Sequence, residues 1–321
     1  MAKSQGYDLI GDVHGCMMTL VKLLEQLGYR KRNGVYQHAN RKAVFIGDIV
    51  DRGPRIREAL HIVRDMVEHG SAYIVMGNHE YNALGYCTRA RPGSGHTYLR
   101  EHNERHERLI RETLDQFEAY PSEWNDFLEW FYQIPIFLEL EDFRVVHACW
   151  DQHLISQFKE RYGGNLIDED FLHASTVKDS FAGQMMDRLL RGTDMRLPNS
   201  EYIVGKDGFT RHFFRTKFWN DSPEVYQDVV FQPDPLPQHI AEHRLTDAEK
   251  EQLLSYDADQ PPVFVGHYWM SGPPRPIQPN IACLDYSAVK YGKLVAYQMD
   301  GEQELSKDKF VWVDVVKPEH R

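Results

Sequence analysis

The residues best suited to chemistry lie in one short segment, Gly47-Asp48-Ile49-Val50-Asp51-Arg52-Gly53, directly after the apolar run 43–46. Two carboxylates and a guanidinium at the end of a buried strand need charged partners, and a divalent metal ion is one such partner. Taken alone, the segment is equally typical of a polar turn. Two similar segments elsewhere in the chain favour a functional site.

The first of these, Gly11-Asp12-Val13-His14-Gly15, follows the apolar residues 7–10, and the second, Gly77-Asn78-His79-Glu80, follows residues 72–76. Each apolar run ends in glycine, then Asp or Asn, then histidine or a carboxylate. The intervals of about thirty residues carry helical patterns at 17–27 and 55–67. This order predicts βαβαβ layering in which the polar loops converge at one edge of a sheet.

Two later strands, predicted at 143–146 and 262–265, also end in histidine. Carboxylate, imidazole and amide groups together suit divalent ions of borderline to hard character. The candidate ligands are Asp12, His14, Asp48, Asn78, His147 and His267. Six groups exceed the needs of one ion, so we expect two ions bridged by Asp48 on the middle strand. One ion would take Asp12 and His14, and the other Asn78, His147 and His267.

Such a metal pair can ionise a bridging water to hydroxide and hold a phosphoryl group in line for its attack. We expect His79 to act as the general acid for the leaving oxygen, oriented by Asp51. Arg52 offers a planar fork for two phosphoryl oxygens, although a salt bridge to Asp51 or Glu80 is the alternative. Asp285 fits either a partner of a ligand histidine or the start of a turn.

The composition restricts the kind of partner. The chain has 321 residues, a net charge of −11, and 42% hydrophobic residues. An acidic protein has no broad attraction for nucleic acid or anionic membranes, so a phosphorylated substrate must be held by local positive charge. No apolar run approaches the ~20 residues of a membrane span. Four scattered cysteines and the absence of a signal-peptide core at the first residues favour a cytoplasmic protein.

We expect a single domain over 1–321, with an inserted cap or substrate-binding region at about 151–260, where the pattern is irregular. Helices are predicted at 97–117, 122–132, 168–191 and 245–256. Within the insertion, residues 211–219 are basic and aromatic. Arg211 and Arg215 are candidate substrate-binding residues that would grip a polyphosphate from one helical face while an aromatic ring stacks on a base. A lid helix packed on the core is the alternative.

The three glycine-containing motifs resemble the signature of the calcineurin-like metallophosphoesterases. The Asp51-Arg52-Gly53 ending is similar to the branch that holds the phosphoprotein phosphatases, bacteriophage lambda phosphatase and the symmetric diadenosine tetraphosphatases. The resemblance implies an α+β fold in α/β/β/α layers, with a two-sheet β-sandwich flanked by helices. It also implies two divalent ions, manganese or an iron–zinc-type pair, held by the ligands given above.

The chain departs from that family pattern in two places. His147-Ala148-Cys149 stands where the protein phosphatases have His-Gly-Gly, and Gly266-His267-Tyr268-Trp269 lacks the second histidine of many broader relatives. The long interval between His147 and His267 leaves the substrate open, because substrate-binding loops usually lie there.

The main functional hypothesis is a dimetal-dependent phosphoesterase that hydrolyses phosphate monoesters on proteins or small molecules. A symmetric dinucleoside polyphosphate hydrolase is the alternative within the same class of enzyme. A non-catalytic binding protein on the same fold is the alternative from another class. The presence of every expected ligand and of His79 argues against the last one.

Overall fold

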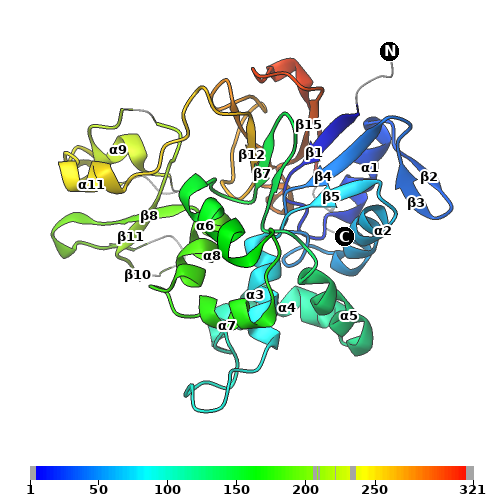
Figure 1. The fold of residues 1–321 in the computed structure, drawn as a ribbon, viewed down its shortest axis with the longest axis horizontal. Helices are drawn as coiled ribbons and strands as arrows, with labels where there is room; N and C mark the ends of the chain where they lie inside the picture. Colours follow the sequence, from blue (N-terminus) through cyan, green and yellow to red (C-terminus); the bar gives the residue numbers. More distant parts are fainter. Residues whose placement is uncertain (1–4, 205–207, 209, 221, 232–235, 316–321) are drawn as a thin grey trace.

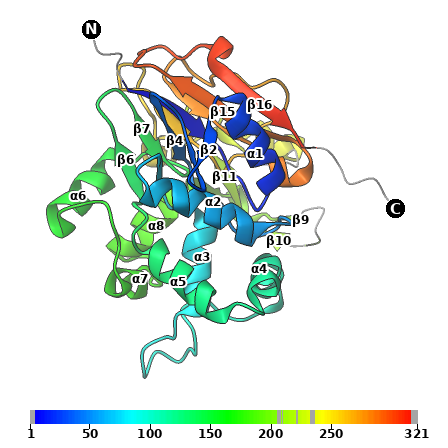
Figure 2. The same ribbon diagram turned by 90° about the vertical axis from the view of Figure 1, so that its right-hand side faces the viewer.

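The computed structural model describes residues 5–204, 208, 210–220, 222–231 and 236–315. Two β-sheets form the centre, with helices around them (Figures 1 and 2). The larger sheet has the order β14-β15-β1-β4-β5, with β16 paired to β15. Its strands are β1 (Gly6–Ile10), β4 (Arg41–Phe45), β5 (Ala72–Ile74), β14 (Asp285–Tyr286), β15 (Lys293–Met299) and β16 (Phe310–Asp314). The smaller sheet, of order β13-β12-β7-β6, comprises β6 (Phe137–Glu139), β7 (Arg144–Val146), β12 (Val263–Val265) and β13 (Ile281–Cys283).

Parallel pairing brings the polar strand ends together. In the larger sheet β1 pairs parallel with β4, and β4 with β5, so that Ile10, Phe45 and Ile74 stand side by side. In the smaller sheet β12 pairs parallel with both β7 and β13. The carboxyl ends of neighbouring parallel strands meet at one edge of a sheet. The predicted βαβαβ layering is therefore present, and two strands of the second sheet point their ends into the same region.

Alternation along the strands divides each sheet into two apolar faces. Leu9 and Val44 pack against Val145 and Phe264 in a core between the two sheets. Their neighbours in the sequence, such as Ile10, join the outer core beneath the helices. The expected two-sheet sandwich flanked by helices is confirmed by this arrangement and by solved structures with a related fold, reported below.

The flanking helices lie on the outer faces of the sandwich. Helices α1 and α2 cover the larger sheet, while Phe158 of α6 packs edge-on against Phe137 of β6 on the smaller one. The helices are α1 (Met17–Gln26), α2 (Ile56–Glu68), α3 (Asn78–Cys87), α4 (Glu104–Phe117), α5 (Pro121–Phe131), α6 (Gln152–Tyr162), α7 (Glu169–Ser175) and α8 (Phe181–Arg191). A hairpin of β2 (Arg30–Arg32) and β3 (Val35–Gln37) follows α1. None of the described helices is long and apolar enough to cross a bilayer.

Three of the predicted helices have different limits in the structure. The helix expected at 97–117 begins only at Glu104, because the Asn103 side chain accepts a hydrogen bond from the His106 amide and caps it. The helix expected at 168–191 is two helices, because Ser180 caps the start of α8 in the same manner. The helix expected at 245–256 spans only Asp247–Gln252, capped by Thr246.

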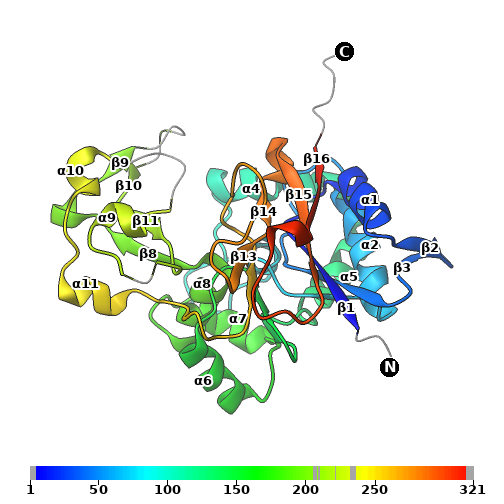
Figure 3. The ribbon, with the colours of Figure 1, turned by 90° about the horizontal axis from the view of Figure 1, so that it is seen from above.

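The segment 193–253 forms a lobe beside the sandwich (Figures 1 and 3). The lobe contains β8 (Thr193–Arg196), β9 (Ile203–Val204), β10 (Thr210–Arg211), β11 (Phe213–Thr216), α9 (Tyr226–Val229), α10 (Gln238–Ala241) and α11 (Asp247–Gln252). It has its own small apolar cluster, which includes Leu197, Phe214 and Tyr226. By contrast, α6 to α8 pack into the main core. The lobe is thus shorter than the predicted insertion, and the division of the chain into one domain with a cap stays a prediction.

The prediction of a helix at 211–219 is wrong. Residues 213–216 pair antiparallel with β8, and residues 210–211 pair with β9. Threonine and aromatic side chains favour strands, and here the pairing partners are available within the lobe. Arg211 and Arg215 therefore lie on strands and have different surroundings.

Gly53 sits where the loop after β4 touches the loop after β1. A Cβ atom at Gly53 would lie 1.7 Å from the backbone oxygen of His14 and 2.8 Å from the carbonyl carbon of Gly15. Backbone atoms cannot rotate away as a flexible side chain can, so only glycine permits this approach. The contact sets the distance between the two loops that carry Asp12, His14 and Asp48.

We expect Gly53→Ala to lower the free energy of unfolding by about 1–3 kcal/mol, because the methyl group must push the loops apart. Thermal unfolding followed by circular dichroism measures the effect. Gly164→Ala is the matched control, since nothing lies within 4 Å of a Cβ atom there. A melting temperature of Gly53→Ala equal to that of the control would contradict the steric argument.

Candidate dimetal site

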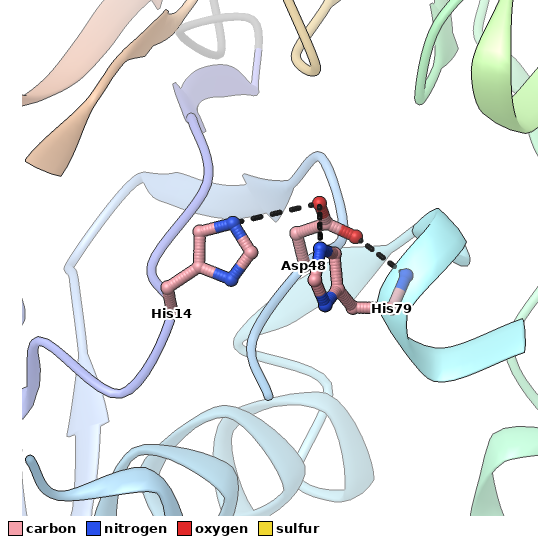
Figure 4. Close-up of side chains that lie close together, drawn as sticks. All are labelled: His14, Asp48 and His79. Carbon is pink, nitrogen blue, oxygen red and sulfur yellow. Dashed lines mark hydrogen bonds and ion pairs between the residues drawn. The ribbon is translucent and has the colours of Figure 1, made fainter. Parts of the chain in front are cut away.

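The carboxylate of Asp48 lies at the centre of the candidate site, surrounded by histidine rings (Figure 4). Its Oδ2 atom is 3.3 Å from His147 Nε2, 3.6 Å from His14 Nε2 and 3.9 Å from His79 Nε2. Its Oδ1 atom accepts a hydrogen bond of 2.9 Å from the His79 amide. These residues come from loops after β1, β4 and β7 and from the start of α3, so Asp48 contacts side chains from three other segments of the site.

The remaining candidate ligands lie beside this centre. The Oδ1 atom of Asn78 is 3.0 Å from His147 Nε2 and 2.9 Å from His267 Nδ1. The Asp12 carboxylate accepts a hydrogen bond of 3.2 Å from the His267 amide. All six predicted ligands are buried. The structure therefore brings together the groups that the sequence placed at separate strand ends, and their binding of metal stays a prediction.

Backbone carbonyls orient two of the histidines. His14 Nδ1 donates to the Val50 oxygen at 2.8 Å, and His147 Nδ1 donates to the Ile46 oxygen at 2.7 Å. With Nδ1 bonded to a carbonyl oxygen, each ring directs its Nε2 toward Asp48. Metal-binding histidines in proteins use the same arrangement.

The residues present fit divalent cations. Burial raises the pKa of Asp12, and the nearby carboxylates of Asp285 and Asp48 raise it further. Burial disfavours the charged ring of His147, yet Asp48 and Asp12 raise its pKa to about 10. One oxygen of Asp12 and Nε2 of His267 are buried without a hydrogen-bond partner. Buried carboxylates that repel one another, together with donor atoms that lack a partner, are what bound cations would compensate.

The atoms that could hold an ion form two groups. Asp12, Asp48 and His147 make one group, and His14, Asp48 and His79 make the other. Asp48 belongs to both groups, as expected of a bridging ligand. Both groups differ from the predicted division. The first joins Asp12 with His147, which were assigned to different ions, and the second contains His79, which was expected to serve as the general acid.

Strained backbone is concentrated in the same loops. Positive φ angles occur at His14 (40°), Asp48 (51°), Asp51 (69°), Arg52 (67°), His267 (68°) and Trp269 (24°). These are six of the eleven non-glycine residues with positive φ in the described part of the chain. Such conformations cost free energy and persist where the surroundings impose them, which is common at functional sites.

Glu80 holds these loops in place. Its carboxylate accepts hydrogen bonds from the backbone amides of Asp48, Ile49, Val50 and Gly77, at 2.8–3.2 Å. Because one buried side chain ties the loop after β4 to the start of α3, it fixes Asp48 relative to Asn78 and His79. The sequence analysis considered Glu80 only as a partner of Arg52. The position of Glu80 directly after Asn78 and His79 is the sequence signal that points to a role at the site.

His79 and Asp51 form the expected pair. The Nδ1 atom of His79 donates to Asp51 Oδ2 at 2.5 Å, which leaves Nε2 directed at Asp48. Thr113 of α4 donates to the other Asp51 oxygen at 2.5 Å and accepts from the Asp51 amide at 3.0 Å. The role of Thr113 has no signal in the sequence, since it lies 62 positions from Asp51.

Arg52 does not form the salt bridge considered as its alternative. No ion pair of Arg52 with Asp51 or Glu80 occurs among the described residues. Its guanidinium instead lies 3.3 Å from His14 Nε2 and 5.0 Å from the centre of the Trp269 ring. The Lys290 ammonium lies 3.3 Å from the same ring centre. Trp269 and Lys290, which the sequence analysis missed, thus place a second positive charge near Arg52.

The two arginines of the lobe have different positions. Arg215 donates to the backbone oxygen of His267 at 3.4 Å, and burial lowers the pKa of its guanidinium. Arg211 is exposed and lines a pocket of about 1270 Å³ between the lobe and α8. Arg215, Arg188, Arg191 and Trp269 line the same pocket. The lobe therefore places Arg215 at the site and Arg211 in the pocket beside it.

Asp285 forms the turn considered for it, and no hydrogen bond from its side chain to a candidate ligand histidine occurs among the described residues. One oxygen accepts from the Trp269 amide at 3.0 Å and the other accepts from the Ser287 amide at 2.9 Å. Its charge also raises the pKa of Asp12, after burial. Asp285 thus forms a turn and also fixes the loop that follows the candidate ligand His267.

Comparisons with known proteins agree with this geometry. The family model for calcineurin-like phosphoesterases matches residues 8–268. A protein of Oceanobacillus iheyensis named bis(5'-nucleosyl)-tetraphosphatase PrpE (asymmetrical) is 34% identical over 163 residues, which cover 48% of this chain and 60% of that protein. The protein of the same name from Bacillus cereus is 32% identical, with 55% of this chain and 72% of that protein covered.

Among solved structures, a protein serine/threonine phosphatase from Saccharomyces cerevisiae superposes with a TM-score of 0.51 at 13% identity, covering 100% of this chain and 82% of that one. At this identity the likeness concerns the fold alone. The family model, in contrast, extends over all six candidate ligands. The chain therefore belongs to the calcineurin-like phosphoesterase family.

Proposed function

We propose that this protein is a dimetal-dependent phosphoesterase. The observation that carries the proposal is the convergence of six buried donor groups around Asp48, next to the hydrogen-bonded pair of His79 and Asp51. Two divalent ions held by these residues would supply the acidity that ionises water and the charge that binds phosphoryl oxygens. Manganese, or an iron–zinc pair, suits the mixed nitrogen and oxygen donors.

Each remaining residue has a defined part in this proposal. Asp51 holds the Nδ1 proton of His79, so that Nε2 can give a proton to the leaving oxygen. Arg52 and Arg215 reach the region of His14 and His267 and would bind phosphoryl oxygens by charge-assisted hydrogen bonds. The binding-protein alternative is disfavoured, because a protein that only binds phosphate needs no oriented acid.

The proposed substrate class is phosphate esters or anhydrides with more than one phosphate. The relatives are named as bis(5'-nucleosyl)-tetraphosphatases, and the pocket beside the site has a volume of about 1270 Å³ and is lined with arginines. A dinucleoside polyphosphate fits these observations better than a phosphoprotein does. The relatives' names specify asymmetrical cleavage, whereas the sequence analysis considered symmetrical cleavage, and separation of the nucleotide products decides between them. A cytoplasmic location suits such a metabolite and the four unpaired cysteines.

Asp48→Asn is expected to lose both metals and turnover while keeping its fold, because an amide cannot supply the bridging negative charge. Metal content by mass spectrometry, turnover of p-nitrophenyl phosphate with Mn²⁺, and circular dichroism check these points. Asp115→Asn, at an exposed position of α4, is the matched control. Normal turnover in Asp48→Asn would remove the bridging assignment.

His79→Asn is expected to lower kcat by about a hundredfold or more with metal content unchanged, because the proton donor is lost. Asp51→Asn should also lower kcat, because Nδ1 of His79 loses the carboxylate that orients the ring. Rapid kinetics and metal analysis on the same preparations test this. Loss of metal from His79→Asn would show that His79 is a ligand, as its grouping with His14 and Asp48 allows.

Arg215→Ala is expected to lower kcat/KM by about ten- to a hundredfold, the effect of removing a charged hydrogen-bond donor from the reacting phosphate. Arg211 lies in the same segment but is exposed. Arg211→Ala should therefore lose distinctly less kcat/KM on p-nitrophenyl phosphate, because this substrate carries a single phosphate. The two variants remove the same charge from neighbouring strands. Equal losses would contradict the assignment of Arg215 to the site.

A further inference from the structure

A second, smaller pocket of about 280 Å³ lies between α3, α7, α8 and the segment that leads into α4. Tyr81 and Asn82 of α3 form one wall, and Asp187 and Arg191 of α8 form another. Arg100 closes a third side. This volume is close to the lower limit of about 300 Å³ for ligand pockets in proteins. The sequence analysis gave no role to any of these residues.

Positive charge in this pocket exceeds negative charge. Three cations, Arg100, Lys178 and Arg191, face one carboxylate, Asp187. Arg191 already pairs with that carboxylate, because it donates to Asp187 Oδ1 at 2.6 Å. It also donates to Asn82 Oδ1 at 2.8 Å. Among the described residues that line this pocket, no further carboxylate faces Arg100 and Lys178, although Lys178 also lies close enough to Asp194 of the larger pocket for their charges to interact.

Arg100 is the most unusual of the three. Its side chain is half-buried, and in the described part of the chain it forms neither an ion pair nor a side-chain hydrogen bond. Burial and the charge of Arg191 lower the pKa of Arg100 to about 10, so it still carries its proton at neutral pH. A half-buried guanidinium with unused donors and a cationic neighbour favours binding of an anion.

Lys178 supplies the second set of donors. Its ammonium lies 5.5 Å from the centre of the Phe213 ring, and no side-chain hydrogen bond of Lys178 occurs within the described ranges. The hydroxyls of Tyr81 and Ser175 are already joined to each other at 2.8 Å. The donors left for a ligand are thus the planar fork of Arg100 and the ammonium of Lys178, which together suit the oxygens of a phosphate.

The pocket adjoins the candidate dimetal site. Tyr81 and Asn82 lie about one helical turn along α3 from Asn78 and His79, roughly 5 Å in axial distance. Lys178, Asp187 and Arg191 also line the larger pocket that contains Arg215, so the two pockets share a wall. A molecule with one phosphate at the dimetal site could extend a second phosphate toward Arg100.

We propose that Arg100 and Lys178, beside the positive charge of Arg191, form an anion subsite that binds a phosphate other than the one being hydrolysed. The bound phosphate is either the far phosphate of a polyphosphate substrate or a free phosphate ion. Assignment to the substrate rests on the proposed function, whereas binding of the anion itself does not. The subsite would let the protein distinguish a polyphosphate from a simple monoester.

The first test is calorimetric titration of inorganic phosphate into the full-length chain, before and after removal of its metals. The metal-free chain should bind phosphate, and Arg100→Gln should weaken that binding at least about tenfold. Arg100→Lys keeps the charge and should lose less affinity for phosphate. Arg64→Gln removes the same charge from an exposed pair with Glu68 on α2 and should bind as the wild type does.

Thermal unfolding shows whether the variants fold. In phosphate-free buffer Arg100→Gln should melt no lower than the wild type, because Arg100 forms no ion pair in the described part of the chain. Added phosphate should raise the melting temperature of the wild type more than that of the variant. Equal phosphate affinity in Arg100→Gln and the wild type would overturn the subsite. Loss of phosphate binding in Arg52→Gln but not in Arg100→Gln would place the anion at the dimetal site and overturn it as well.

Kinetics with two substrates identifies the source of the anion. If the subsite holds the far phosphate, Arg100→Gln loses more kcat/KM on diadenosine tetraphosphate than on p-nitrophenyl phosphate, and inorganic phosphate competes with the dinucleotide in the wild type. If it holds a free phosphate, the anion binds together with the dinucleotide. Phosphate binding without turnover of any substrate would overturn the proposed function and leave the subsite standing.

Discussion

The burial of three carboxylates at one point is the constraint on which the rest of this structure depends. Asp12, Asp48 and Asp285 lie together beneath the loops, and burial and mutual repulsion raise the pKa of Asp12 and of Asp285. Burial also opposes ionisation of Asp48, but the charges of His147 and His79 hold its pKa well below the usual range. Without compensating cations such a cluster would destabilise the fold, so the site and its expected metal ions belong to the architecture.

The scaffold holds this cluster by means that leave the donor atoms free. Backbone carbonyls bond to Nδ1 of His14 and of His147, on the side of each ring away from Asp48. The Glu80 carboxylate accepts hydrogen bonds from the amides of the loop that carries Asp48. Close contacts at glycines, such as Gly53 against His14, let the loops approach without side chains between them. Because each device acts on the backbone or on the outer side of a ring, the inner atoms keep their capacity to bind a ligand.

Positive charge reaches the site from parts of the chain outside the sandwich. The lobe contributes Arg215, α8 contributes Arg191, and the segment before α4 contributes Arg100. In a protein with a net charge of −11, these arginines concentrate positive potential along the two adjoining pockets. The sandwich thus supplies the candidate metal donors, while the surrounding helices and the lobe supply the contacts from which substrate choice would arise.

Sequence patterns alone predict the parallel layering of β1, β4 and β5 and the six polar groups at strand ends, because glycine followed by Asp, Asn or His after an apolar run is a local pattern. They also pair His79 with Asp51, which the structure joins at 2.5 Å. The strands of the lobe, the bonds of Glu80 and Thr113, and the neighbourhood of Arg100 and Arg191 depend instead on how distant segments pack together. The bond from Val50 to Glu80, the bonds between Thr113 and Asp51, and the approach of Arg191 to Arg100 join residues 30, 62 and 91 positions apart. Packing that no local pattern encodes sets these partners.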